Sequence, residues 1–282
     1  MTRAVLAALF EGLFDDAALF PPASLPMPNA VRGHAGHRLS WYADMVGPFV
    51  CNARRLRELD DQAAGCSVAL IEVAVVVPDG IEAVPKALDT IGSCERLRLA
   101  ALEVSIGYHR LPEVLRALAP LTATRVPVFV EIPAPRVTED AVHDLNAQGL
   151  RLKLRTGGTT VDAFCPEAAL AVAIVRCAAE RLAFKCTAGL HHAVRHRDPA
   201  TLLEHHGFLN IALAARVAAS TGSAATTAAV RSERHSQEIL RRVVEFSSAD
   251  VTATRALFGS FGTCSVADPV GDLTAMGLVT GP

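Results

Sequence analysis

Two short stretches of the sequence each place a lysine inside an apolar run that leads into threonine and glycine. They are residues 152–158, LKLRTGG, and residues 184–190, FKCTAGL. A lysine between such neighbours in a parallel strand should be buried, and a buried ammonium group is costly unless it is paired or loses its proton. Two of them, Lys153 and Lys185, on successive strand–helix units indicate a site rather than a scaffold.

Carboxylates occupy the two strands that we expect to precede these lysines. Residues two apart in a strand share a face, and adjacent strands lie about 4.8 Å apart. Glu103, Glu131, Lys153 and Lys185 can therefore meet inside a barrel, toward the C-terminal ends of the strands, where barrel enzymes carry out their chemistry. A salt-bridge network that only fills the barrel is the structural alternative. Apolar replacement of such a network is often as stable, which favours a functional role.

A lysine amine attacks a carbonyl carbon only when it is neutral, whereas the ordinary pKa of lysine is about 10.4. Desolvation and a second cation both lower that pKa. Lys185 beside Lys153 or Arg155 fits this requirement, and we expect a lowered pKa for Lys185. Glu103 or Glu131 would then transfer protons during imine formation and carbon–carbon cleavage.

The setting of Lys185, FKCTAG, resembles that of class I aldolases of the deoxyribose-phosphate aldolase kind. Those enzymes are barrels whose Schiff-base lysine lies on the sixth strand in a Lys-x-Ser-Thr-Gly-like sequence. The resemblance covers about a tenth of the chain and implies that Lys185 forms the Schiff base. In the family the helper lysine follows on the next strand, whereas here Lys153 precedes Lys185, and the expected seventh strand has no lysine.

A second resemblance covers more of the chain and implies no activity. The run FDDAALFPPA at residues 14–23 and the run GLHH at residues 189–192 are similar to those of a group of bacterial proteins without an assigned activity.

Half of the ten histidines lie just after the sixth expected strand. They are His191, His192, His196, His205 and His206. One interpretation is capture of a phosphate or carboxylate by His191, His192 and Arg195. A second is a divalent metal ion, the one cofactor considered, held by His191 and His192 with Glu103 and Glu131. The third is a solvated basic loop.

Two further places can bind an anion or contribute a carboxylate. Backbone N–H groups in the turn with Gly157 and Gly158 can hold an anion, although an ordinary tight turn is equally compatible with the sequence. Asp15 can reach the site if the N-terminal segment folds over the barrel mouth. The residues that we expect to bind substrate are Arg155, Thr187, His191, His192, Arg195, Gly157, Gly158 and Asp15.

The alternation of apolar strands and helices from residue 47 predicts a (β/α)8 barrel in a single domain of residues 1–282. Residues 1–46 are expected to form an N-terminal helical arm, and residues 47–282 the barrel. The expected strands are 47–51, 67–76, 97–106, 126–132, 150–155, 183–188, 208–211 and 261–265. The seventh of these also suits a helix, so an incomplete barrel or a doubly wound parallel sheet is the alternative.

Composition limits the partners. The formal net charge is −2, and 51% of the 282 residues are hydrophobic, which favours neither nucleic acid nor a membrane surface as partner. No apolar run approaches the length of a membrane span. Seven scattered cysteines without CxxC pairs indicate a cytoplasmic protein. The apolar N-terminal helix makes a homo-oligomer possible.

These observations favour a lyase of aldolase type that acts through Lys185 on a small oxygenated or phosphorylated carbonyl compound. We expect this substrate to be an anion and the reaction to need no cofactor. Two alternatives stay open. One is a metal-dependent lyase, isomerase or hydrolase, and the other is a non-catalytic protein that binds a small molecule.

Overall fold

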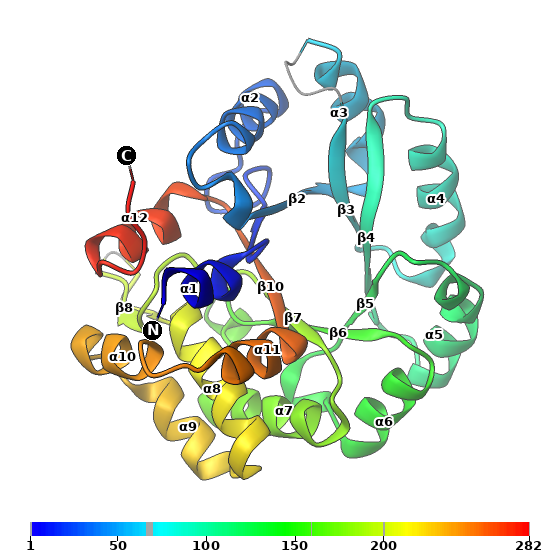
Figure 1. Ribbon diagram of the computed structural model, residues 1–282. Helices are drawn as coiled ribbons and strands as arrows, with labels where there is room; N and C mark the ends of the chain where they lie inside the picture. The colour runs from blue at the N-terminus through cyan, green and yellow to red at the C-terminus, as the bar shows by residue number, and fades with distance from the viewer. Residues whose placement is uncertain (1, 66–69, 159, 200, 282) are drawn as a thin grey trace.

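Eight parallel strands close into a barrel, with helices around it (Figure 1). The computed structural model describes residues 2–65, 70–158, 160–199 and 201–281. The order around the barrel is β1-β10-β7-β6-β5-β4-β3-β2. The strands are β1 Phe14–Asp16, β2 Val46–Asn52, β3 Ile71–Val77, β4 Leu97–Ser105, β5 Val128–Glu131, β6 Arg151–Arg155, β7 Phe184–Thr187 and β10 Phe258–Thr263. The predicted (β/α)8 architecture is confirmed.

The helices alternate with the strands from β2 to β7, and four helices then follow one another without strands between them before β10. They are α1 Arg3–Phe10, α2 Met27–Arg38, α3 Leu56–Ala63, α4 Val84–Gly92, α5 Leu111–Leu118, α6 Glu139–Ala147, α7 Glu167–Glu180, α8 Phe208–Thr221, α9 Ala224–Ser232, α10 Ser236–Val243, α11 Ser248–Leu257 and α12 Ala267–Ala275. After β7, the short strands β8 His196–Arg197 and β9 Glu204–His205 pair as an antiparallel hairpin.

Two expected elements are wrong. Residues 208–211 are the first turn of α8 and not a strand. All of residues 208–215 are buried, since α8 packs against α7, α9 and α11, and a helix buried on every side has the same unbroken apolar sequence as a buried strand. The missing strand is β1, inside the segment expected to be a helical arm outside the barrel. Three residues are too few to show a period of two.

The second expected strand begins at residue 67, and residues 67–69 lie outside the described part of the chain. The described strand there, β3, begins at Ile71.

The barrel interior contains a small apolar cluster separate from the main core. It consists of Ala17, Val50, Ala74, Ala101 and Phe129, with Phe20 and Val76 packed against it. Most of these side chains are short. They therefore leave space inside the barrel for the long side chains of neighbouring strands.

Aromatic packing holds β1 in place between β10 and β2. The ring of Phe14 lies 5.6 Å from that of Phe208 and 5.4 Å from that of Phe261, measured between centroids. Phe208 and Phe261 stack at 5.1 Å. These contacts join the shortest barrel strand to α8 and to β10.

We predict that Phe14→Ala lowers the free energy of unfolding by about 3–5 kcal/mol, because it removes a buried aromatic ring and leaves a cavity at the barrel closure. Urea denaturation followed by circular dichroism measures this. Leu39→Ala is the control, because Leu39 is 76% exposed and its truncation should change stability by less than about 0.5 kcal/mol. Equal stability of the two variants would contradict the role assigned to β1.

Candidate active site

The two buried lysines are joined by one shared carboxylate, that of Glu103 on β4. Lys185 on β7 donates hydrogen bonds to Asp15 Oδ2 on β1 and, at 2.5 Å, to Glu103 Oε1. Ser260 on β10 donates a 2.7 Å hydrogen bond to the same oxygen of Asp15. Asp15, Glu103 and Lys185 are each at most 2% exposed, so their charges are compensated almost entirely by one another.

The second lysine continues the alternation of charge. Lys153 Nζ on β6 lies 2.7 Å from Glu103 Oε2 and 2.9 Å from Glu131 Oε2. Arg155 Nε then contacts Glu131 Oε1 at 3.1 Å, closer to solvent. We call this set the lysine–carboxylate network; its members are Asp15, Lys185, Glu103, Lys153, Glu131 and Arg155.

Strand register explains why residues so far apart in the sequence meet. Glu131 on β5 is level with Lys153 on β6, and Lys153 is level with Lys185 on β7. On the other side, β1 pairs with β10 so that Asp15 is level with Gly262. A Cβ atom on Gly47 of β2 would overlap Asp15 Oδ1, so glycine at this position leaves space for the carboxylate.

The pKa of Lys185 is raised, which corrects the expectation of a lowered value. Burial acts to lower it, but the negative charges of Asp15 and Glu103 and their hydrogen bonds outweigh burial. The pKa of Lys153 is raised for the same reason, by Glu103 and Glu131. Sequence reasoning placed a cation beside Lys185, whereas the neighbours that touch it are carboxylates. Both lysines are therefore ammonium groups in the resting protein.

The pKa values of the three carboxylates in the network shift in different directions. Burial would raise the pKa of Glu103, but Lys153 and Lys185 together hold it at about 2. Burial also acts against ionisation of Glu131, and Lys153 with Arg155 lowers its pKa. For Asp15, burial prevails over Lys185 and raises the pKa. Glu103, with both oxygens bonded to ammonium groups, is thus a weak base.

A cavity of about 640 Å³ opens above the network. Its floor includes Lys153, Lys185, Arg155 and Glu103. Thr187, Ala188 and Gly189 at the end of β7, and Gly262 on β10, also line it, which places the cavity at the C-terminal end of the barrel. The volume is typical of small-molecule sites. Lys153, Lys185 and Arg155 present N–H donors at this floor beside one carboxylate, whereas Asp198 and Asp268 line the cavity elsewhere. An anionic group is therefore favoured at the floor and not throughout the cavity.

Four histidines form one side of the cavity mouth: His191, His192, His196 and His205. The ring of His196 lies 4.7 Å from that of His192 and 5.4 Å from that of His205, between centroids. Burial, aided by neighbouring histidines, lowers the pKa of His191 and of His196. A neutral imidazole can accept a proton but carries no positive charge for a phosphate. These four histidines are therefore better suited to proton transfer than to phosphate binding.

His192 has a fixed orientation. Its Nδ1 lies 3.1 Å from Asp272 Oδ2 on α12, and the same oxygen accepts a 2.7 Å hydrogen bond from the backbone of Ala193. His191 Nδ1 lies 3.4 Å from the Thr263 hydroxyl and 3.6 Å from Cys264 Sγ. Sequence reasoning missed Asp272 and this histidine contact of Cys264, because more than seventy residues separate the partners.

Arg195 is not brought to the cavity. It is 5% exposed and is held by Glu167 and by Glu204, the latter at 3.3 Å. His206 lies beside it, and burial with the nearby arginines lowers the pKa of His206 to about 3. Arg195 therefore belongs to an ion-pair cluster that fixes the base of the β8–β9 hairpin, and its expected role in substrate binding is wrong.

The two glycine turns pack against each other. A Cβ atom on Gly189, whose φ is +76°, would lie 3.0 Å from Gly157 Cα. Thr156 reinforces this approach, since its backbone N–H donates to the carbonyl of Thr187 at 2.9 Å. Gly158 lines the cavity. The structure thus gives Gly157 a packing role and leaves Gly158 and Thr187 available to a ligand.

Among the residues that the structure describes, no three His, Cys, Asp or Glu side chains are grouped as metal ligands, so His191, His192, Glu103 and Glu131 do not form such a group. Nor does any described helix have the length and apolar character to cross a bilayer.

One sequence signal could have strengthened the prediction. Lysine occurs only three times, at positions 86, 153 and 185, among 27 basic residues. All the other basic residues are arginines. Two of the three lysines lie in the network, which indicates that the compact ammonium group is what this site requires.

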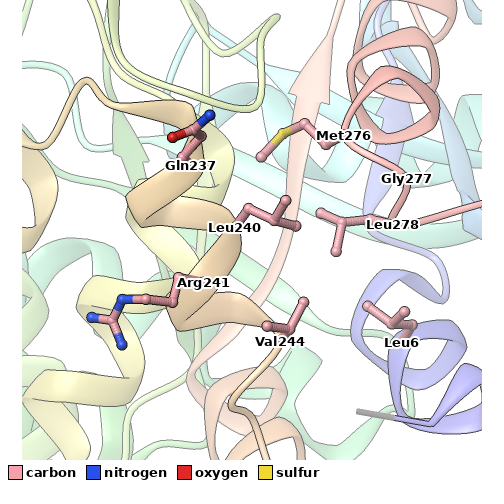
Figure 2. A pocket seen from close by; sticks show the side chains of 8 residues that line it. All are labelled: Leu6, Gln237, Leu240, Arg241, Val244, Met276, Gly277 and Leu278. Atoms are coloured by element: carbon pink, nitrogen blue, oxygen red, sulfur yellow. The ribbon is translucent and has the colours of Figure 1, made fainter.

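A second pocket lies between α1, α10 and the segment after α12 (Figure 2). Leu6, Leu240 and Leu278 are among its mostly apolar lining residues. Arg241 at its edge is engaged with Glu238 at 2.9 Å. The described lining holds neither a carboxylate nor a histidine, so this pocket has no means of proton transfer.

The lowered pKa of Glu103 predicts a pH effect on stability. Above its ordinary pKa of 4.5 the stabilisation is fully present, and it is lost as pH falls toward about 2, because the unfolded chain takes up the proton first. Urea denaturation between pH 6 and pH 2.5 should show wild type losing more stability than Glu103→Gln. That variant should also be less stable at pH 7 by about 3–5 kcal/mol, since it breaks a buried ion pair. Parallel pH curves would contradict this assignment.

Comparisons with known proteins establish no family. No protein-family model matches the chain, and no curated protein does. Among solved structures, the chain is similar to dihydropteroate synthase from Xanthomonas albilineans, with a TM-score of 0.43 and 13% sequence identity, over 95% of this chain and 92% of that one.

Proposed function

We propose that this protein is an enzyme of the lyase class that acts on a small anionic carbonyl compound by forming its enolate. The observation that carries the proposal is the pair of buried lysines on the floor of the cavity, linked through Glu103. A fixed pair of ammonium groups in a poorly solvated site is suited to a substrate that becomes more negative during the reaction.

The lysines act in this proposal as ammonium groups. Asp15 and Glu103 raise the pKa of Lys185, so its resting form is not the neutral amine that attacks a carbonyl. An ammonium group beside the substrate carbonyl stabilises the enolate oxygen without any covalent bond. A Schiff base at Lys185 would first require loss of its proton, and that route is the competing outcome of the experiment below.

The proton leaving the substrate carbon needs an acceptor. Glu103 is a poor one, because both of its oxygens accept from lysines and its pKa is about 2. The histidines that line the same cavity are better suited to this role, because their imidazoles are not bonded to ammonium groups. Among them, His191 is kept neutral by burial, and His192 is oriented by Asp272.

The first test is exchange of the protons on the carbon next to the carbonyl of 2-oxo acids such as pyruvate, followed by NMR in D2O. Wild type should accelerate the exchange. Lys185→Met should slow it about 100-fold or more, as expected for loss of a preorganised group that stabilises developing charge. Lys185→Arg should retain part of the activity, because it keeps the positive charge. If wild type accelerated the exchange of none of the 2-oxo acids tested, the proposed function would be rejected.

The second test separates the ammonium role from the Schiff base. Borohydride is added to wild type with pyruvate, and the mass of each lysine-containing peptide is measured. We expect no adduct at Lys185. Lys86→Met is the matched control, because the side chain of Lys86 is exposed and this variant removes the third lysine without touching the cavity. An adduct at Lys185 that survives in Lys86→Met would show that Lys185 is a nucleophile.

A further inference from the structure

The cavity has two chemically different halves. The floor presents Lys153, Lys185 and Arg155, whereas one side of the cavity is built by Phe20, Val50 and Val76. Ala17, Pro21 and Pro22 extend that side toward the mouth. We call Phe20, Val50 and Val76, with these three residues, the apolar wall.

The apolar wall is part of the packed interior. Ala17 and Val50 belong to the apolar cluster inside the barrel, and Phe20 and Val76 pack against it. The segment that carries Phe20 is also tied by its own backbone. Phe20 N donates to Ala17 O at 2.8 Å, and Leu25 N donates to Ala18 O at 2.9 Å. The wall is therefore formed before any ligand binds.

Asp16 anchors this segment at its beginning. One of its oxygens accepts from the Ala18 backbone at 3.2 Å, and the other lies 3.0 Å from Nδ1 of the buried His34. The two neighbouring aspartates thus have different roles. Asp15 belongs to the lysine–carboxylate network, whereas Asp16 holds the start of the segment that carries Phe20.

Such a wall discriminates among anionic carbonyl compounds. A phosphate or a hydroxyl group placed against it would lose hydrogen bonds to water without replacement, which is unfavourable. A methylene group placed there gains affinity, because its apolar surface leaves water. The floor can hold the carboxylate and the carbonyl at the same time, so the remainder of the substrate must lie along the wall or toward the histidines.

Resting on the proposed function, we infer that the substrate is a short oxo acid with an apolar side chain, rather than a sugar phosphate. The carboxylate and carbonyl lie on the floor, over Lys153, Lys185 and Arg155. The side chain lies along Phe20, Val50 and Val76. This assigns chain-length specificity to the apolar wall and reactivity to the floor.

The test uses pyruvate, 2-oxobutanoate, 2-oxopentanoate and 2-oxohexanoate, with titration calorimetry for affinity and the exchange reaction for KM. The dissociation constant should fall about fourfold for each added methylene group. Phe20→Ala should reduce that gain to about twofold or less. Val76→Ala is a second variant of the wall, in which a smaller side chain is truncated and the gain per methylene group should also fall.

Two controls separate the wall from the floor and from general effects. Lys185→Arg should weaken binding of all four acids by a similar factor and leave the gain per methylene unchanged. Val244→Ala truncates a 38% exposed side chain in the pocket of Figure 2, away from the cavity, and should change neither quantity.

A flat series, or tighter binding of 4-phosphono-2-oxobutanoate than of 2-oxohexanoate, would overturn this inference while exchange of pyruvate protons kept the proposed function intact. If none of the four acids bound or exchanged, both the inference and the proposed function would be rejected.

Discussion

The central constraint on this molecule is that Glu103 must neutralise two buried ammonium groups at once. Each of its oxygens accepts from a different lysine, at 2.5 Å from Lys185 and 2.7 Å from Lys153. Without Glu103, Lys185 would retain only Asp15 and Lys153 would retain only Glu131, so each buried ammonium group would lose one of its two carboxylate partners. The barrel strands β4, β6 and β7 must therefore keep their register for the interior to be stable at all. The same requirement fixes the geometry of the site.

Barrel closure and site assembly depend on the same short strand. β1 spans only three residues, and it contributes an aromatic side chain to one face and a carboxylate to the other. Phe14 packs against Phe208 and Phe261 outside the sheet, while Asp15 reaches Lys185 inside it. A change that loosens this strand would consequently lower stability and alter the charge around Lys185 together.

The division of the cavity into a charged floor and an apolar wall follows from where the barrel interior has long and short side chains. β6 and β7 supply lysines, whereas Val50, Ala74 and Val76 on β2 and β3 are short and apolar. An anionic group is therefore attracted to one half and excluded from the other. This asymmetry orients a ligand before any residue moves.

The sequence by itself predicted a parallel α/β fold, with the closed barrel as its first choice, the charged residues on the inner faces of β4 to β7 and the histidine-rich segment after β7, because each depends on a local period or composition. It did not determine β1, which is too short to show a period, or the helix at residues 208–211, whose unbroken apolar sequence suits either element. Only the tertiary structure decided the sign of the pKa shift at Lys185 and the separation of Arg195 from the cavity. Both depend on which charges touch across the barrel, and long-range contact leaves no trace in local sequence.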